Sequence, residues 1–550
     1  MRELQPSVHV DTFARDHLPP RDQWPEMDWT TLPELMAYPP TMNAAAELLD
    51  SWIEAGHGER ACFSFEGETW SYARLLETAN RVANVLTHEL GVVPGERVLL
   101  RGPNNPMFIA CWFGVLKAGA IAVATMPLLR ARELEYVCNK AQVKYALCDM
   151  RLAEEMKKTL LSADRLKKVV YYDGSGIGAL NEIMSQVSDD FDNVETSIDD
   201  VALIAFTSGT TGSPKGCMHF HRDIMTICDT FSRYVLRPTS NDVFLGSPPI
   251  AFTFGLGALV TFPMHAGAST VLIEKATPAL LLETIQSEAV TTLFTAPTMY
   301  RVLLEEMDGF DISSLNKCVS AGETLPKPTF EAWKKATGLR IIDGLGSTEM
   351  LHIFITAAGD DARAGATGKA IPGYEAKVVD DDGNDVADGT VGRLAVRGAT
   401  GCRYLDDPEN QARYVSDGWN FPGDAYLRDE DGYFFFQARA DDMIISAGYN
   451  ISGPEVEEVL LEHDKVAECG VVASPDKERG FIVKAFVVAR DNAGSDEFAI
   501  ELQNFVKAEI APYKYPRAIE FVDELPRTET GKLQRFKLRH QELDRAQSAG

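Results

Sequence analysis

A ten-residue run rich in Gly, Ser and Thr constrains this chain more than any other feature. The apolar run Val201–Phe206 is typical of a buried β-strand, and residues 207–216 (TSGTTGSPKG) follow it directly. Three glycines let the backbone turn tightly and approach a ligand closely. Hydroxyls, free backbone N–H groups and one lysine would form a concavity suited to phosphate oxygens. The residues predicted to hold phosphate are Thr207, Ser208, Gly209, Thr210, Thr211 and Lys215.

This run has two alternative interpretations. It is not a Walker A loop, because Pro214 stands where that motif requires glycine. A Ser/Thr/Gly surface turn is the plain alternative. The position directly after a strand favours phosphate binding, and the pattern beyond the run predicts a helix from about His219.

The length and net charge of the chain limit the classes of protein to which it can belong. The chain has 550 residues, too many for one ordinary core, so two or more domains are expected. It carries 53 basic and 81 acidic residues, a net charge of −28. Nucleic acid and anionic membrane surfaces need a basic footprint, so neither is expected as a partner. An anionic ligand must then be held by local donors and a metal ion.

Cysteines and the N-terminus indicate a compartment. The nine cysteines are scattered, odd in number and free of any C-x-x-C motif, which favours buried free thiols in a reducing compartment. The N-terminal residues are polar and contain no apolar core of a secretory signal. The longest apolar tract, 109–127, is broken by Lys117 and by glycines, so it predicts a buried helix and strand. A cytoplasmic location is expected.

Strand and helix patterns alternate over most of the chain, which predicts an α/β fold with parallel sheets. The first series begins at Arg97–Arg101 and the second at Val201–Phe206. Phe63 to Tyr72 predicts a hairpin, 169–178 a loop, and 1–45 an extended arm on the surface. The remaining expected strands are 121–125, 144–148, 242–246, 269–273, 291–295, 317–320 and 340–342.

The pattern of apolar and turn-forming residues changes twice toward the C-terminus. Residues of about 365–436 show short alternating segments punctuated by Gly, Asp and Pro, which predicts a small β-subdomain. Residues 441–550 combine strands and helices in a unit large enough to fold alone. We therefore expect an N-terminal domain at 1–440, with two βαβ-rich subdomains and the β-subdomain, and a mobile α+β domain at 441–550.

Seven motifs in order make the chain resemble the adenylate-forming superfamily, which includes acyl-CoA ligases, nonribosomal adenylation domains and luciferases. The resemblance covers nearly the whole chain. Its motifs are TSGTTGSPKG (207–216), SAGETL (320–325), DGLGSTEM (343–350), GKAIPG (368–373), DGWNFPGD (417–424), ARADDMIISAGYNISGPEVEE (438–458) and PRTETGKLQR (526–535).

The resemblance implies a nucleotide site for ATP and Mg²⁺. Glu349 would coordinate the metal ion and Thr348 would bond a phosphate oxygen, although Glu349 also suits the first turn of a helix. Asp424 would accept the ribose hydroxyls near Arg439, unless it is an ordinary turn aspartate. Leu345 stands where most relatives have an aromatic residue, so adenine would pack on aliphatic carbon. The implied adenine contacts are Gly322, Glu323, Thr324, Asp343, Gly344 and Leu345.

The C-terminal motifs imply a lysine that acts in catalysis and a hinge. Lys532 would offset the charge when a carboxylate attacks the α-phosphate, whereas a solvated tail lysine is the plain alternative. Asp441 falls at the hinge that would swing the small domain between two half-reactions. The second half-reaction uses coenzyme A, and its expected contacts are Gly448, Tyr449, Arg479 and Lys514.

Two strings resemble benzoate-type ligases more than fatty-acyl ligases, namely AFTFGLG (251–257) and DGLGSTEMLHIF (343–354). The N-terminal string HVDTFARDHLPP resembles the 2-aminobenzoate-CoA ligase group. Thr253 or His352 could bond an ortho substituent, and a satisfied core histidine is the alternative for His352. The implied aryl pocket is Phe252, Thr253, Phe254, Ala296, Ala321, Leu345 and His352.

The sequence therefore predicts an ATP-dependent, AMP-forming ligase of an aryl acid and coenzyme A, with 2-aminobenzoate as the first candidate acid. Benzoate or salicylate as the acid, and a stand-alone adenylation domain that loads a carrier protein, remain open. A luciferase-like oxygenase and a nucleotide-binding regulator without catalysis are less favoured. The expected partners are small molecules, and the chain is expected to be a monomer or homodimer.

Overall fold

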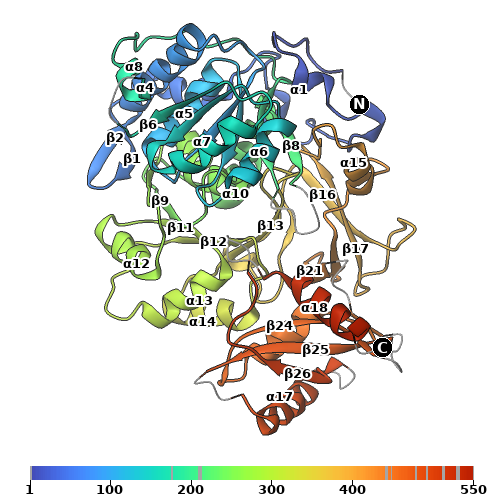
Figure 1. Ribbon diagram of the computed structural model, residues 1–550. Helices are drawn as coiled ribbons and strands as arrows, with labels where there is room; N and C mark the ends of the chain where they lie inside the picture. Colours follow the sequence, from blue (N-terminus) through green and yellow to red (C-terminus); the bar gives the residue numbers. More distant parts are fainter. Residues whose placement is uncertain are drawn as a thin grey trace.

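The chain folds into a large N-terminal part and a smaller C-terminal unit, drawn at the bottom of Figure 1. The computed structural model describes residues 3–174, 178–207, 214–439, 444–446, 449–476, 480–490, 494–510, 514–527 and 533–548. The predicted class is confirmed: an α/β fold with a large N-terminal domain and a smaller α+β C-terminal domain. The boundary predicted at 440/441 lies outside the described residues and stays a prediction.

The first sheet has the strand order β6-β5-β3-β4-β7-β8 and is parallel except for the β7–β8 pair. Its strands form because short, apolar, β-branched runs can be buried on both faces of a parallel sheet. Helix α5 is buried along its whole length. The elements are β3 Arg97–Arg101, β4 Ile121–Thr125, β5 Tyr145–Asp149, β6 Lys168–Tyr172, β7 Val201–Phe206, β8 Gly216–Phe220, α4 Tyr72–Asn84, α5 Pro106–Lys117, α6 Ala131–Lys140, α7 Ala153–Ser162, α8 Leu180–Met184 and α9 His221–Ile227.

The second sheet has the order β15-β14-β13-β12-β11-β9-β10-β1-β2. Its central strands are parallel, and the predicted hairpin forms one edge. The elements are β1 Ala61–Phe65, β2 Glu68–Ser71, β9 Val243–Gly246, β10 Ser269–Val271, β11 Thr292–Thr295, β12 Lys317–Ala321, β13 Ile342–Gly346, β14 Ile353–Thr356, β15 Lys369–Ala370, α10 Thr253–Leu256, α11 Phe262–Ala266, α12 Pro278–Ser287, α13 Pro297–Glu306 and α14 Lys327–Thr337.

The predicted β-subdomain forms a third, antiparallel sheet. Buried and partly exposed residues are mixed along β16 and β17 without strict alternation. Its elements are β16 Tyr374–Val379, β17 Gly392–Gly398, β18 Val415–Ser416, β19 Trp419–Asn420, β20 Asp424–Arg428, β21 Phe434–Arg439 and α15 Pro408–Tyr414.

The C-terminal unit has its own core and lies against helices α13 and α14 of the large domain (Figure 1). The Arg301 guanidinium donates to the backbone oxygen of Ala467 at 2.7 Å, and Lys327 N donates to Glu458 Oε1 at 3.2 Å. Its elements are β22 Ile444–Ser446, β23 Tyr449–Ile451, α16 Gly453–Leu461, β24 Val466–Asp476, β25 Gly480–Ala489, α17 Asp496–Glu509, β26 Ala518–Phe521 and α18 Arg535–Ser548.

Three local predictions were wrong. The phosphate loop leads into strand β8, and helix α9 begins only at His221, because 216–220 pairs with β7. The segment expected to be a loop from 169 contains β6, whose partner is β5. The strand expected at 340–342 is β13, which begins only at Ile342 and runs through glycine-rich residues to Gly346. An added Cβ at Gly344 would lie 2.4 Å from Ile353 Cδ1, so glycine allows β14 to approach.

The N-terminal arm is less extended than predicted and joins two sheets. Met27 forms a bridge to Gly398, the last residue of β17, and Glu26 N donates to Gly418 O at 2.8 Å. Trp24 is buried and its ring lies 5.9 Å from that of Phe220 on β8. The arm therefore closes the back of the junction between the first and third sheets.

Short helices complete the described chain, and none of its helices is long and apolar enough to cross a membrane. All nine cysteines are buried and free, as predicted. The remaining elements are α1 Phe13–Asp16, α2 Pro33–Met36 and α3 Ser51–Glu54, the 3-10 turns Arg21–Gln23, Met150–Leu152 and Gly359–Asp361, and the π-helical turns Ala46–Asp50, Val85–Glu89, Cys228–Leu236 and Gly257–Thr261.

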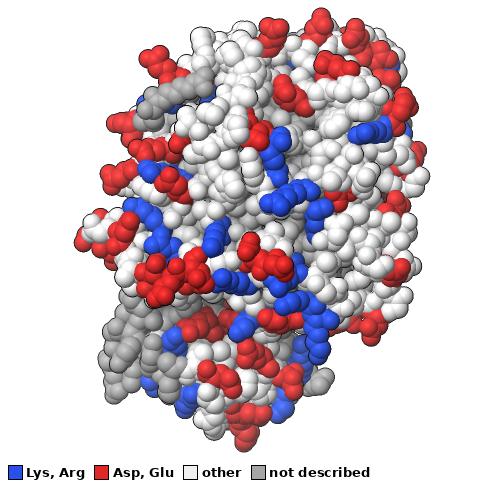
Figure 2. All heavy atoms as spheres, turned by 180° about the vertical axis from the view of Figure 1, so that it is seen from behind, with Lys and Arg blue, Asp and Glu red and all other residues white. Residues whose placement is uncertain are grey.

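The surface carries both signs of charge. On the face drawn in Figure 2, Lys and Arg side chains lie in a band across the middle, and acidic side chains lie between them and along the rim. A continuous basic surface of the kind that binds a phosphate backbone is not seen on that face.

A buried ion pair behind β8 leads to the first prediction. Arg403 and Asp223 are both 0% exposed and paired, and the Arg403 guanidinium lies 4.1 Å from the Phe220 ring centroid. Arg403→Met leaves the Asp223 carboxylate without its cation and is expected to lower the free energy of unfolding by about 3–5 kcal/mol. Urea unfolding followed by tryptophan fluorescence measures it. Arg413→Met, which removes an exposed pair with Glu409, is the control and should change little. Equal stability of the two variants would contradict the argument.

Candidate functional site

The two ends of the predicted phosphate loop are held together where β7 ends. Thr207 N donates to the backbone oxygen of Lys215 at 3.0 Å, and Lys215 N donates to Thr207 Oγ1 at 3.2 Å. The Lys215 ammonium lies 5.5 Å from the ring centroid of Tyr404. Four further predicted phosphate residues lie outside the described residues, namely Ser208, Gly209, Thr210 and Thr211.

Glu349 lies in a turn at 347–350 that follows β13, and it is 9% exposed. The Tyr404 hydroxyl donates to Glu349 Oε1 at 2.6 Å. Burial, followed by the charge of Glu349, raises the pKa of Tyr404 well above its usual value, so the phenol stays a donor. Since the phenol occupies one oxygen of the carboxylate, the other oxygen is left for a ligand.

The turn that carries Thr348 and Glu349 is fixed from several sides. His219 Nε2, on β8, lies 2.8 Å from the backbone oxygen of Thr348. Thr400 Oγ1, which follows β17, donates to the backbone oxygen of Met350 at 2.8 Å. Ser347 Oγ and the Tyr414 hydroxyl are 3.1 Å apart. The turn therefore lies where elements of all three sheets of the large domain meet.

His219 is neutral at physiological pH. Burial is the main cause that lowers its pKa to about 3, with the positive charge of Arg403 acting in the same direction. A carbonyl oxygen only accepts, so Nε2 must carry the hydrogen that Thr348 O receives. Nδ1 is then an acceptor, and it lies 3.8 Å from Asp223 Oδ2, too far for a hydrogen bond.

The donor set fits a Mg²⁺ ion that is held mostly by its nucleotide. Within the described part of the chain no group of three or more His, Cys, Asp or Glu side chains is placed to bind a metal. Glu349 contributes a carboxylate with one oxygen left for a ligand, and Lys215 lies near the same Tyr404 that binds the other oxygen. Mg²⁺ in phosphate-transfer sites commonly binds one or two carboxylates together with substrate phosphates and water.

The predicted adenine residues lie at the carboxyl ends of two neighbouring strands. In the parallel β12–β13 pair, Ser320 is opposite Asp343 and Ala321 is opposite Gly344. Leu345 follows on β13, and Gly322, Glu323 and Thr324 follow β12. Gly322 has a φ of 90°, which a residue with a side chain rarely adopts. The structure thus brings the two predicted walls together.

The carboxyl group of Asp343 has a raised pKa. Burial raises its pKa to about 8, while the nearby Ser320 hydroxyl and the backbone N–H of Gly344 act in the opposite direction. A neutral carboxyl group offers one donor and one acceptor, and the Watson–Crick edge of adenine presents the complementary acceptor and donor.

The two residues predicted near the ribose are cross-strand neighbours. Asp424 begins β20 and pairs directly with Arg439 at the end of β21. Asp424 is 7% exposed, so its side chain is largely buried. The side chain of Arg439 is outside the described residues.

Two of the predicted aryl residues, Phe254 and His352, lie together in an aromatic cluster at α10. Phe254 and His352 are in ring contact, with centroids 5.7 Å apart. Phe231 and Phe262 contact the same imidazole at 5.2 and 4.5 Å, and an added Cβ at Gly257 would lie 2.4 Å from His352 Cδ2. The other predicted members lie at the ends of elements: Phe252 and Thr253 at α10, Ala296 before α13, Ala321 at the end of β12 and Leu345 on β13.

His352 is buried without a hydrogen-bond partner. Burial lowers its pKa to about 3, so the ring is neutral. Neither nitrogen has a partner; the Phe254 backbone is close enough to raise the pKa slightly but does not reach hydrogen-bond geometry. The interpretation as a satisfied core histidine is therefore disfavoured, because a neutral imidazole carries one donor and one acceptor.

Most of the predicted C-terminal residues cannot be placed. Lys532, Asp441, Gly448 and Arg479 lie outside the described residues, as does the side chain of Tyr449, whose backbone begins β23. Lys514 is described, and its ammonium contacts both carboxylate oxygens of Glu455 at 2.5 and 2.7 Å. Lys514 is thus engaged within the C-terminal unit in this conformation.

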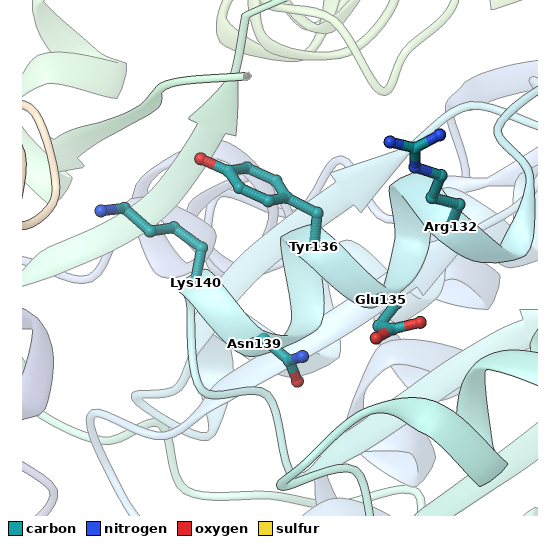
Figure 3. Close-up of a pocket in the computed structure, with 5 residues that line it drawn as sticks. All are labelled: Arg132, Glu135, Tyr136, Asn139 and Lys140. Atoms are coloured by element: carbon teal, nitrogen blue, oxygen red, sulfur yellow. The ribbon is translucent and has the colours of Figure 1, made fainter.

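A hollow of about 430 Å³ lies along α6 and contains none of the predicted site residues. Figure 3 shows Arg132, Tyr136 and Lys140 on one side of the helix, with Glu135 and Asn139 on the other. Lys140 Nζ donates to the backbone oxygen of Asp406 at 2.8 Å, so the hollow adjoins the segment that carries Tyr404.

The sequence interpretation missed the residues behind the turn. His219, Arg403 and Tyr404 fall outside every residue assignment made from the motifs. The only local signal is a histidine within the otherwise apolar strand Gly216–Phe220, where a buried polar side chain needs a partner. Nothing local in CRYL (402–405) indicates a contact with Glu349.

Comparison with known proteins gives a family match over most of the chain. The family model described as AMP-binding enzyme matches residues 50–403, and the AMP-binding enzyme C-terminal domain matches residues 455–532. Benzoate–CoA ligase of Thauera aromatica is 33% identical over 518 residues, covering 93% of this chain and 98% of that protein. The mitochondrial acyl-coenzyme A synthetase ACSM3 of Mus musculus is 32% identical and covers 92% and 91%.

Similar solved structures belong to the same class of ligase as these relatives. The anthranilate CoA ligase AuaEII in complex with anthranoyl-AMP has a TM-score of 0.88 at 33% identity, covering 93% of this chain and 99% of that one. A benzoate CoA ligase from Burkholderia xenovorans LB400 has a TM-score of 0.82 at 31% identity, covering 90% and 100%.

Proposed function

The chain belongs to the AMP-binding enzyme family, and from that premise we propose that it activates an aryl carboxylic acid as its adenylate and transfers the acyl group to coenzyme A. The coarser class, an AMP-forming acid–CoA ligase, follows from the family and from relatives similar along nearly their whole length. The acid and the roles of individual residues are the proposal.

One observation carries it: the turn at 347–350 places a carboxylate beside a lysine-bearing phosphate loop, and His352, two residues after the turn, lies in an aromatic cluster. Glu349 accepts from the Tyr404 hydroxyl, and the Lys215 ammonium lies 5.5 Å from the ring centroid of that tyrosine. His352 contacts Phe254. A site for the triphosphate and a pocket for a flat ring therefore adjoin along one short segment. Carboxylate attack on an α-phosphate requires that adjacency.

The proposed chemistry has two balanced steps. A carboxylate oxygen of the acid attacks the α-phosphorus of ATP, which forms the acyl–AMP anhydride and releases pyrophosphate. The thiolate of coenzyme A then attacks the acyl carbon, and AMP leaves with the bridging oxygen. Mg²⁺ bound by Glu349 would neutralise phosphate charge, which is the chemistry that the metal supplies.

The described residues have distinct roles in this proposal. Lys215 and Thr207 would hold phosphate oxygens at the mouth of the loop, and Thr348 would bond the α-phosphate. Asp343 would read the edge of adenine, and Asp424 would accept the ribose hydroxyls. Lys532, from its motif, would approach the α-phosphate in the first step only.

We assign the acid to the 2-aminobenzoate type on the strength of the aryl cluster. Aromatic and aliphatic walls suit a flat ring, and few polar groups are needed to orient it. His352 brings a neutral imidazole with two unpartnered nitrogens into that cluster. Its acceptor nitrogen suits an amino hydrogen in the ortho position. Benzoate lacks the group that would satisfy it, and salicylate offers a hydroxyl in the same place.

The second prediction concerns Thr253, which begins α10 and is 9% exposed. If its hydroxyl bonds the ortho amino group, Thr253→Ala should lower kcat/KM for 2-aminobenzoate relative to benzoate by about 3- to 10-fold, the value of one neutral hydrogen bond. Thr253→Ser keeps the hydroxyl and should keep the ratio. AMP formation with each acid measures it. An unchanged ratio in Thr253→Ala would remove Thr253 from substrate recognition.

A carrier-protein loading domain is the second candidate, favoured by membership of the same superfamily. AMP release that depends on coenzyme A, with no carrier protein present, separates the two functions. A screen of benzoate, 2-aminobenzoate, salicylate and ring-fluorinated analogues in that assay tests the choice of acid. No turnover with any of them would overturn the aryl assignment.

A further inference from the structure

Two buried residues from paired backbone segments hold the turn at 347–350 through hydrogen bonds. The Tyr404 hydroxyl donates to Glu349 Oε1 at 2.6 Å, and His219 Nε2 donates to Thr348 O at 2.8 Å. Tyr404 and His219 are 1% and 0% exposed. We propose that Tyr404 and His219 are positioning residues that set the carboxylate of Glu349 and the backbone of Thr348 for the metal ion and the α-phosphate.

The two residues belong to one rigid platform. Strand β8 pairs with the segment 402–405: Met218 N donates to Arg403 O and Leu405 N donates to Gly216 O, both at 2.8 Å. Cys217 and Tyr404 form a bridge in the same pairing. The strand that carries His219 and the segment that carries Tyr404 are therefore fixed relative to each other by backbone hydrogen bonds.

The back of the platform is closed by the buried ion pair. Arg403 pairs with Asp223, and Asp223 Oδ2 also accepts from the Phe220 backbone at 2.8 Å. The Trp24 ring from the N-terminal arm lies 5.5 Å from the Arg403 guanidinium. Neither His219 nor Tyr404 can then move without disturbing packed neighbours, and a positioning residue needs that rigidity.

Each residue controls one degree of freedom. The phenol fixes one oxygen of Glu349, so the terminal carboxylate torsion, which is otherwise broad, has a single orientation. The imidazole N–H fixes the peptide between Thr348 and Glu349, and therefore the direction of the Thr348 side chain. Outer partners of metal-binding carboxylates commonly change metal affinity or activity by about 10- to 100-fold when they are removed.

The proposal rests on the proposed role of Glu349 as the metal ligand, and the experiment separates the two. Tyr404→Phe removes only the hydroxyl. We expect it to raise the free Mg²⁺ concentration for half-maximal ATP–pyrophosphate exchange by about 10- to 100-fold, with an unchanged melting temperature. Tyr300→Phe is the matched control, because Tyr300 is a buried tyrosine whose hydroxyl donates to Leu293 O and Val319 O and to no residue of the turn.

The histidine is tested by a conservative replacement. His219→Leu should raise KM for ATP by about 3- to 10-fold, because one neutral hydrogen bond is lost. His219→Gln should restore most of it, since the amide N–H can donate to the Thr348 carbonyl. A purely structural role would lower the melting temperature in both variants and leave the Mg²⁺ and ATP dependence of the folded fraction unchanged.

The outcomes decide between the two claims. If both Glu349→Gln and Tyr404→Phe raise the free Mg²⁺ concentration needed for half-maximal exchange, the positioning role holds. Should Glu349→Gln be impaired while Tyr404→Phe matches the Tyr300→Phe control, the positioning role is overturned and the metal role stands. If Glu349→Gln itself keeps the wild-type Mg²⁺ dependence, the metal role fails and the positioning of its carboxylate fails with it. Should Tyr404→Phe not fold, the contrast between His219→Leu and His219→Gln decides alone.

Discussion

A Lys532→Ala enzyme is expected to form the acyl adenylate about 100- to 1,000-fold more slowly than the wild type. The step brings a carboxylate against an α-phosphate, and a positioned ammonium offsets the charge that builds up between them. Loss of one such donor commonly costs two to three orders of magnitude in kcat. ATP–pyrophosphate exchange with 2-aminobenzoate, in the absence of coenzyme A, measures this step alone.

The second half-reaction is the control for that variant. Supplied with preformed 2-aminobenzoyl adenylate and coenzyme A, Lys532→Ala should make the thioester at nearly the wild-type rate, because Asp441 is proposed as the hinge that turns Lys532 away. A variant that exchanges pyrophosphate at the wild-type rate would refute the assignment of Lys532. Equal losses of rate in both half-reactions would refute the proposal that Lys532 acts only in adenylate formation.

Replacement of Glu349 by glutamine should lower the rate of pyrophosphate exchange by about 100-fold or more and leave the fold intact. The amide oxygen can still accept from the Tyr404 hydroxyl, so the turn should persist, while the negative charge that binds the metal ion is lost. Glu331→Gln, on the exposed face of α14, is the matched control. A Glu349→Gln enzyme with normal exchange at low Mg²⁺ would contradict the assignment.

The sequence predicted the order of strands and helices well where burial is uniform. Strands β4 and β7 begin and end at the predicted residues, because strands covered on both faces are continuous apolar runs. The change of sequence pattern near residue 365 likewise coincides with an antiparallel sheet, because short segments separated by Gly, Asp and Pro favour strands joined by tight turns.

The failures share one cause, which is pairing between residues distant in sequence. Residues 216–220 become a strand because β7 and the segment 402–405 flank them. The strand propensity of these five residues alone does not reveal that the distant segment pairs with them. The strand Ile342–Gly346 tolerates two glycines because β14 approaches its backbone closely. Neither neighbour is visible in a local window.

The candidate site divides in the same way. Motifs identify Glu349, Asp424 and the phosphate loop because each needs particular residue types at fixed spacing. The platform of His219, Arg403 and Tyr404 has no such spacing and depends on packing between sheets, so only the structure brings these residues to the turn. His352 was predicted, and its lack of a hydrogen-bond partner adds a reason to regard it as a ligand contact.

The most direct test of the account follows the oxygen atoms of the acid. The purified enzyme is supplied with ATP, Mg²⁺, coenzyme A and 2-aminobenzoate labelled with ¹⁸O in both carboxylate oxygens, and the products are analysed by mass spectrometry. Activation as an anhydride with AMP predicts one ¹⁸O atom in AMP, the other in the thioester and none in pyrophosphate. Recovery of ¹⁸O in inorganic phosphate together with ADP, or AMP without label, would contradict it.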